Sequence, residues 1–304
     1  MKLRDVGEDR LLEQLLPKLP RNTGVVLGAG DDCAVVKSGK RGVLELLKTD
    51  CLVERIHFTE NTPPRQVGWK AMARPLSDFA AMSGLPRFAL VTLVVPATRD
   101  VAWVRQVYRG IERVARQFEV AVVGGETSNT DGPAVISISL TGFVEATRWV
   151  GRAAGKGGDE LFVTGRLGGS LRGSHLKFVP RIVESRWLTK NFPIHAMMDL
   201  SDGLGVDLPR LARASRVGFE LDEAALPLNR GCTIRQAISD GEDYELLFTL
   251  APKDARFLPT RWRKKFPRVA LTRIGRLNRK SVRAEQTAFG NRKFSRGYVH
   301  FKKP

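Results

Sequence analysis

The residues best suited to chemistry in this 304-residue sequence are carboxylates at turns, beside glycine or at the ends of apolar runs. They are Asp31 and Asp32 in GAGDDC, Asp50 after GVLELLKT, Asp78 in LSDFAAM, Glu126 after Gly124 and Gly125, and Asp199 and Asp202 in DLSDG. Carboxylates that converge repel one another unless cations lie between them. Hard oxygen ligands of this kind suit Mg²⁺, which bridges to substrate phosphates. Taken singly, each Asp is better explained as a helix cap or an Asx-turn, so the interpretation depends on the set.

Three common nucleotide-binding motifs are not present. GAGDDC lacks the third glycine of the dinucleotide fingerprint and places two carboxylates where a pyrophosphate would lie. Residues 151–157, GRAAGKG, are one residue short of a P-loop and have no Ser or Thr after the lysine. The HRD and DFG loops of protein kinases are missing as well. A nucleotide would therefore bind by other means.

The elements that must position these carboxylates alternate between strands and helices. In the first half, strands are expected at 42–53, 88–96, 120–127 and 134–145, with helices at 9–19, 101–118 and 65–84, the last interrupted near Pro75. After a glycine-rich break at 151–159, strands are expected at 160–165, 219–222 and 244–250, and a strand, turn and helix over 196–215. The pattern predicts an α/β or α+β protein of two lobes, residues 1–148 and 149–304.

The net charge of +18 is concentrated at one end of the chain. Residues 253–304 carry 17 Lys and Arg against two acidic residues, whereas the rest is close to neutral. Such a segment can recruit polyanions, but core-like Ile274 and Leu277 favour a folded, solvated surface. The longest apolar run, residues 88–97, is too short for the ~20 residues of a membrane span. The three scattered cysteines, with no CxxC and no secretory leader in view, suggest a reducing cytoplasm.

Several segments resemble the thiamine-monophosphate kinase family, part of an ATP-binding superfamily that includes aminoimidazole ribonucleotide synthetase and selenophosphate synthetase. They are GAGDDCAVV, TDCLVERIHF, LSDFAAM, VVGGET, DLSDGLGVDL, GEDYELLFT and GYVHF. The resemblance implies an aminoimidazole ribonucleotide synthetase-like fold, with an N-terminal sheet lobe that binds ATP and dimerises and a C-terminal α/β lobe. It implies the reaction of ATP with thiamine monophosphate to ADP and thiamine diphosphate, by direct transfer on several Mg²⁺ ions. Charge neutralisation between two anionic reactants is what such a transfer needs.

The resemblance also implies the roles of individual residues. The metal ligands would be Asp32, Thr49, Asp50, Asp78, Glu126, Asp199 and Asp202, with Asp50 and Asp78 most important for catalysis. Asp31 ranks below Asp32 as a ligand. ATP would contact Gly124, Gly125, Arg152 and Ser201, and thiamine monophosphate would contact His57, Glu242 and Tyr298.

Some positions depart from the family pattern. Lys48 stands where a small residue, often Ser, precedes Thr-Asp, and its ammonium would either repel a cation or stand in for one. Glu126 replaces an Asp and reaches one methylene further, and Asp240 adds a charge near the expected substrate pocket. Two alternatives stay open: a related enzyme with another small substrate, and a weakened relative whose basic C-terminal lobe binds nucleic acid.

Overall fold

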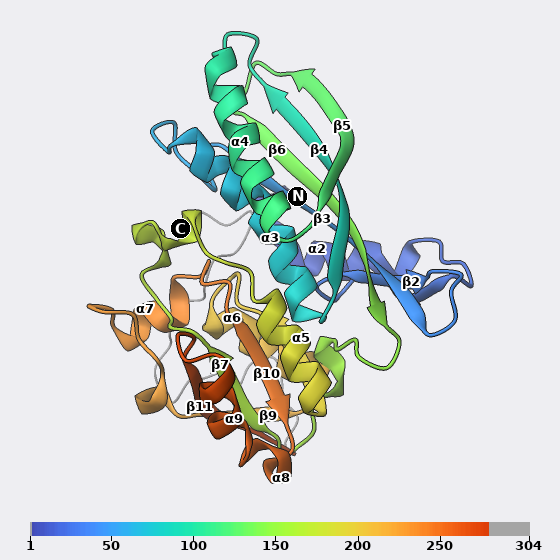
Figure 1. Ribbon diagram of the computed structural model, residues 1–304, viewed down its shortest axis with the longest axis vertical. Helices are drawn as coiled ribbons and strands as arrows, with labels where there is room; N and C mark the ends of the chain where they lie inside the picture. The colour runs from blue at the N-terminus through green and yellow to red at the C-terminus, as the bar shows by residue number, and fades with distance from the viewer. Residues whose placement is uncertain (1, 280–304) are drawn as a thin grey trace. The chain divides into compact units, whose positions relative to one another are not determined.

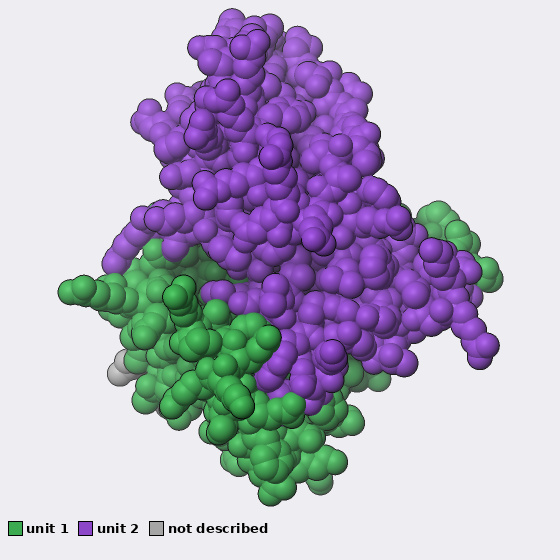
Figure 2. Space-filling model, in the orientation of Figure 1, with its two compact units in different colours: residues 1–31, 151–171, 193–304 green, residues 32–150, 172–192 purple. Residues whose placement is uncertain are grey.

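The computed structural model describes residues 2–279, which divide into two compact units (Figures 1 and 2). Unit 1 contains residues 1–31, 151–171 and 193–304, and unit 2 contains residues 32–150 and 172–192. Both units combine helices with a sheet, so the α/β class is confirmed. The division into lobes 1–148 and 149–304 stays a prediction. Tyr298 and the end of the basic segment lie outside the described residues.

Unit 2 is built on a mixed sheet whose strands run in the order β2-β3-β6-β4-β5. Their bounds are Ala34–Lys37 (β2), Val43–Val53 (β3), Leu85–Val95 (β4), Ala121–Asn129 (β5) and Val135–Glu145 (β6). The β3 and β6 strands pair antiparallel along their full length, and β5 pairs parallel to β4. Buried residues alternate with more exposed ones along β6, which gives the sheet one core face and one open face.

The helices of unit 2 are α3 (Pro64–Ala81), α4 (Val101–Gln117) and α5 (Ile182–Asn191). α3 packs on β3, β4 and β6, and against α4 (Figure 1). A Cβ at Gly68 would lie 1.9 Å from the Val107 carbonyl oxygen, so only glycine allows the two helices this approach. The interruption expected near Pro75 is wrong, because α3 runs through it. A proline removes one helical hydrogen bond, and the extensive burial of α3 outweighs that loss.

Unit 1 contains a five-stranded antiparallel sheet in the order β8-β10-β7-β11-β9. Its bounds are Glu160–Thr164 (β7), Ile194–Asp199 (β8), Gly218–Leu221 (β9), Leu246–Leu250 (β10) and Leu271–Asn278 (β11). The other elements are α1 (Leu3–Val6), α2 (Glu8–Leu15), β1 (Val25–Leu27), α6 (Leu204–Ala214), α7 (Ile234–Ser239), α8 (Pro252–Ala255) and α9 (Leu258–Lys265).

The buried core of unit 1 includes Leu208, Leu211, Ile274 and Leu277. The part of the basic segment that the structure describes is therefore folded. No helix in residues 2–279 has the length and apolar character needed to span a membrane.

Candidate active site

In unit 2, two of the predicted carboxylates, Asp32 and Asp78, lie close together, and a lysine links a third, Asp50, to Asp78. Asp32 and Asp78 are 2% and 7% exposed, and one carboxylate oxygen of each lies within 4.8 Å of the other. Asp50 projects from β3 and is joined to Asp78 through the Lys48 ammonium, whose Nζ lies 2.9 Å from Asp78 Oδ1 and 4.0 Å from Asp50 Oδ1. The structure therefore brings together Asp32, Asp50 and Asp78, as the resemblance implied, and places a lysine among them.

Two cations, Lys48 and Arg74, offset part of the negative charge of these carboxylates. Arg74 of α3 donates to the Cys51 carbonyl oxygen at 2.8 Å, and its Nη2 lies 3.8 Å from Asp50 Oδ1. Burial opposes ionisation of Asp50, but Lys48 and Arg74 lower its pKa below the ordinary value. Burial likewise opposes the charge on Lys48, but Asp78 and Asp50 raise its pKa above the ordinary value. Both groups are therefore ionised at neutral pH.

Other predicted residues of unit 2 lie elsewhere. Successive strand side chains point to opposite faces, so Thr49 faces away from Asp50. Its Oγ1 accepts a hydrogen bond from Ser139 at 3.2 Å on the open face of the sheet. Glu126, Gly124 and Gly125 lie on the exposed strand β5. The roles of these residues as metal or ATP ligands stay predictions.

His57 follows β3 and organises the turn there. Its Nδ1 accepts a hydrogen bond from the Val53 amide at 2.9 Å, and its carbonyl oxygen accepts one from Lys70 at 2.8 Å. Lys70 is fully buried in α3, so this contact ties the turn to the helix. The predicted contact of His57 with substrate is not tested by these bonds.

In unit 1, the DLSDG and GEDYEL segments lie against each other. The Glu242 and Tyr244 amides donate to the carbonyl oxygens of Ser201 and Leu200, at 2.7 Å and 2.8 Å. A Cβ on Gly241 would lie only 3.0 Å from the Ser201 carbonyl oxygen. These contacts bring a predicted ATP contact, Ser201, next to a predicted substrate contact, Glu242.

Asp199 and Asp202 flank this loop. Asp199 ends β8 and is 2% exposed. Asp202 forms an ion pair with Arg210 of α6, which also reaches Asp207 Oδ1 at 3.3 Å. Asp207 is fully buried and accepts the Asp202 and Gly203 amides at 3.0 Å and 3.1 Å. Burial and the charge of Asp202 raise the pKa of Asp207 well above its ordinary value.

Arg152 and Asp240, which the sequence analysis placed near ligands, have protein partners in unit 1. Asp31 Oδ2 accepts the Arg152 amide at 3.0 Å, and its carboxylate lies 3.8 Å from the Arg152 guanidinium. Asp31 thus has both a backbone and a side-chain partner in Arg152, and its role as a ligand stays a prediction. Asp240 accepts the Gly169 amide at 2.8 Å, so its added charge is held by the backbone.

Asp243, Arg74 and Arg210 were missed in the sequence analysis. Asp243 accepts the Gly168 amide at 3.1 Å, and burial raises its pKa to about 8. The sequence contained a signal for the arginines: Arg74 lies four residues before Asp78, and Arg210 three after Asp207, spacings that share a helix face. Helical spacing alone does not show that Arg74 also reaches Asp50 on β3.

The donor set of unit 2 fits a hard divalent cation. Asp32 and Asp78 supply carboxylate oxygens at short separation in a buried position, where their negative charges repel unless a cation lies near both. The same set already includes the Lys48 ammonium, which satisfies part of that charge. Cations bound by these carboxylates could neutralise the charge of substrate phosphates and align the phosphates for a reaction.

Comparison with known proteins identifies the family of the chain. Residues 30–144 match the AIR synthase related protein, N-terminal domain, and residues 150–260 match the AIR synthase related protein, C-terminal domain. These matches define the class: an AIR synthase related protein.

Relatives within this class are more specific. The thiamine-monophosphate kinase of Rhodopirellula baltica is 38% identical over 91% of this chain and 92% of its own length. That of Aquifex aeolicus is 34% identical over 91% and 93%. A solved structure, AaThiL complexed with AMPPCP and TMP, is 32% identical with a TM-score of 0.80 over 92% of this chain and 94% of its own. The chain belongs to the thiamine-monophosphate kinase family, which confirms the resemblance seen in its motifs.

Proposed function

We propose that this protein transfers the γ-phosphoryl group of ATP directly to thiamine monophosphate, giving ADP and thiamine diphosphate. The observation that carries the proposal is the 38% identity to a thiamine-monophosphate kinase over nearly both full lengths. The AaThiL structure holding AMPPCP and TMP supports the same pair of reactants. The convergence of Asp32, Asp50 and Asp78 in unit 2 supports a reaction between two anions.

In the proposed mechanism, the phosphate oxygen of thiamine monophosphate forms the new bond to the γ-phosphorus while the bond to ADP breaks. Bound Mg²⁺ would supply charge neutralisation and alignment of the two phosphates. Its ligands in unit 2 would be Asp32, Asp50 and Asp78, and in unit 1 Asp199 and Asp202. Thr49, whose side chain faces away from Asp50, and Glu126, on the exposed strand β5, stay predicted ligands apart from that cluster. The chain's own task is to keep these carboxylates ionised and fixed in orientation, and the ion pairs of Asp50 and Asp202 serve that task.

The remaining predicted residues would hold the two reactants. Gly124, Gly125, Arg152 and Ser201 would contact ATP, and His57, Glu242 and Tyr298 would contact thiamine monophosphate. The backbone bonds that join Glu242 to Ser201 support a shared position for the two reactants within unit 1.

Phosphorus NMR of the purified protein with Mg-ATP and thiamine monophosphate tests the reaction. The wild type is expected to form ADP and thiamine diphosphate. Asp50→Asn, which loses one negative charge in the cluster, is expected to slow turnover by orders of magnitude. Asp131→Asn, a change at an exposed turn, is expected to keep full turnover. Intact ATP with the wild type would refute the proposal, and turnover of a different small acceptor would favour the altered-substrate alternative.

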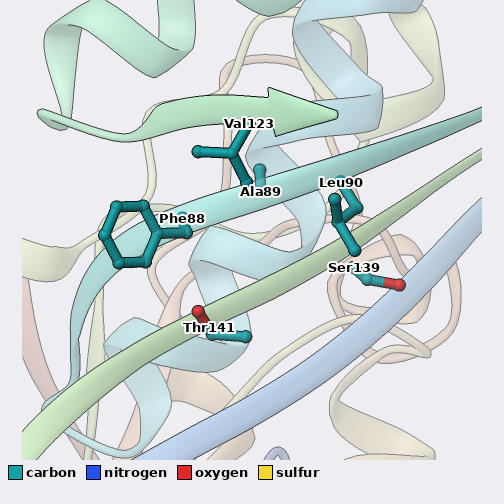
Figure 3. A pocket seen from close by; sticks show the side chains of 6 residues that line it. All are labelled: Phe88, Ala89, Leu90, Val123, Ser139 and Thr141. Carbon is teal, nitrogen blue, oxygen red and sulfur yellow. The ribbon is translucent and has the colours of Figure 1, made fainter. Parts of the chain in front are cut away.

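We further propose a homodimer formed through the open face of the unit 2 sheet. Apolar side chains gather there from β4 and β5: Phe88, Leu90 and Val123 are 38%, 49% and 58% exposed, and line a shallow groove with Ser139 and Thr141 of β6 (Figure 3). Contiguous exposed apolar surface marks an interaction site, and a second copy would cover the same surface on each partner. The same contact would also protect strand β5, at the sheet edge, from pairing with strands of other proteins.

Sedimentation velocity tests this interface. The wild type is expected to sediment as a dimer, and Val123→Glu as a monomer, because the interface would bury an isolated carboxylate. The control is Val183→Glu, which adds the same charge at an equally exposed valine, 61% exposed on α5, and is expected to stay dimeric. A dimer that survives Val123→Glu would contradict the proposed interface.

A further inference from the structure

The Lys48 ammonium lies between two carboxylates of unit 2, Asp50 and Asp78. Lys48 and Asp50 are two residues apart on β3, so both side chains project from the same face of the strand, toward α3. Nζ is 2.9 Å from Asp78 Oδ1, a contact distance, and 4.0 Å from Asp50 Oδ1. The Lys48 side chain is only 21% exposed, and this limits its freedom to swing into solvent.

A cation at this point joins two elements that would otherwise present like charges to each other. Asp78 comes from a helix and Asp50 from a strand, and Lys48 contacts both. A divalent ion bound to the same Asp78 oxygen would lie within a few ångströms of the ammonium. Repulsion between cations at such a distance in a partly buried site is strong.

Arg74 of α3 is a second cation beside Asp50. Its guanidinium is held by the Cys51 carbonyl oxygen and lies 3.8 Å from Asp50. Lys48 forms an ion pair with Asp78. Removal of the Lys48 charge therefore takes away a cation 2.9 Å from Asp78 Oδ1, a carboxylate that lies close to the Asp32 carboxylate.

We propose that the Lys48 ammonium is a built-in cation that positions Asp50 and Asp78 and takes one of the cation places in the acidic cluster. This protein then needs one divalent ion fewer than its carboxylates would otherwise bind. The inference rests on the proposed function only in treating these carboxylates as metal ligands. Lys48 acts through the carboxylates and is a positioning residue.

Titration of the full-length protein with Mn²⁺, followed by the electron paramagnetic resonance signal of free Mn²⁺, tests the proposal. Lys48→Gln removes the charge and keeps a hydrogen-bond donor. It is expected to bind one additional Mn²⁺, or to bind Mn²⁺ at least tenfold more tightly than the wild type. Lys48→Arg, which keeps the charge, is expected to retain wild-type binding, and so is Lys37→Met, a change at an exposed lysine on β2. Equal number and affinity of Mn²⁺ sites in wild type and Lys48→Gln would overturn the proposal.

Thermal melting provides a second readout. In EDTA, Lys48→Gln is expected to melt below the wild type, and Mn²⁺ is expected to restore most of the difference, because a divalent ion replaces the missing ammonium. If Lys48→Gln fails to fold in EDTA, refolding yield is measured instead, and recovery with Mn²⁺ supports the proposal. Failure to fold in both media would overturn it, since a divalent ion would then not replace the ammonium.

Both measurements are made without nucleotide or thiamine monophosphate. A protein that shows the expected Mn²⁺ response but no phosphoryl transfer would retain this inference and lose the proposed function. The reverse result would retain the function and remove the inference.

Discussion

The pairing of β5 with β4 depends on the absence of a side chain at Gly125. A Cβ built on Gly125 would lie 1.8 Å from the Val91 carbonyl oxygen, which belongs to the residue that pairs with Gly125 in the β4–β5 ladder. A Cβ on Gly124 would meet only the Leu90 side chain, at 3.5 Å. The two glycines have φ angles of +158° and +157°, so any conformational cost of a side chain is common to both. The comparison of Gly125→Ala with Gly124→Ala therefore isolates the steric contact.

The expected size of the effect follows from that overlap. Separating the strands by more than ~1 Å stretches a ladder hydrogen bond from its usual ~2.9 Å beyond the range in which such a bond exists. Overpacking costs about 1–3 kcal/mol, and each lost hydrogen bond about 1 kcal/mol. Gly125→Ala is thus expected to be about 2–4 kcal/mol less stable than Gly124→Ala. This corresponds to a melting temperature lower by roughly 5–10 °C.

Circular dichroism melting measures the global part of this effect, and hydrogen exchange of residues 121–129 measures the local part. Since β5 is an edge strand, some of the strain can be relieved by its local separation, which speeds exchange there. If Gly125→Ala matches Gly124→Ala in both melting and exchange, the reasoning from close backbone approach is refuted. A selective loss of ATP binding without either change would favour the ATP-contact role of Gly125.

Two further predictions concern ionisable groups. Burial raises the pKa of Asp243 to about 8 in the folded protein, so the free energy of unfolding falls as pH rises from about 4 to about 8, where the unfolded chain has lost this proton. Asp243→Asn should therefore raise the melting temperature more at pH 8 than at pH 5. Equal increases in melting temperature at the two pH values would contradict this. The Glu145 pKa is lowered to about 2 by its hydrogen bonds from Arg186, so that pair stabilises above about pH 4.5 and its contribution is lost as pH falls toward 2. Arg186→Met should lower the melting temperature more at pH 7 than at pH 2, where only the pH-independent hydrogen bond of Arg186 to the Ser83 carbonyl oxygen is lost. Equal decreases in melting temperature at the two pH values would contradict this.

The positions of the strands could be predicted well from the sequence. Strands expected at 42–53 and 134–145 are found as Val43–Val53 and Val135–Glu145, because alternation of apolar residues reports a sheet with one buried face. The same alternation sets Asp50 apart from Thr49, a consequence that the family resemblance alone did not provide. Pro75 was misjudged for a local reason: proline disfavours a helix, but burial of its neighbours is a tertiary effect that a local pattern does not contain.

The partners of the charged residues could be predicted less well. The sequence identified Asp31, Asp50 and Arg152, but their partners come from segments distant in sequence. Asp31 binds the amide and guanidinium of Arg152, and Asp50 faces Arg74 of another element. Such pairs depend on the folded path of the chain, whereas a motif records only what is adjacent. For the same reason the sequence left two interpretations of Lys48 open, repulsion of a cation or replacement of one, until its distance from Asp78 was known.

The backbone of the GEDYEL segment is strained at two residues. Glu242 and Tyr244 have φ angles of +54° and +51°, a left-handed conformation that is uncommon for residues other than glycine. Such strain costs on the order of 1 kcal/mol or more at each residue and persists only where the surroundings enforce it. Here the enforcing contacts are the amide hydrogen bonds of both residues to the Leu200–Ser201 carbonyl oxygens. The strained path thus fixes Glu242 beside Ser201, and the contacts of these two residues with ligands stay predictions.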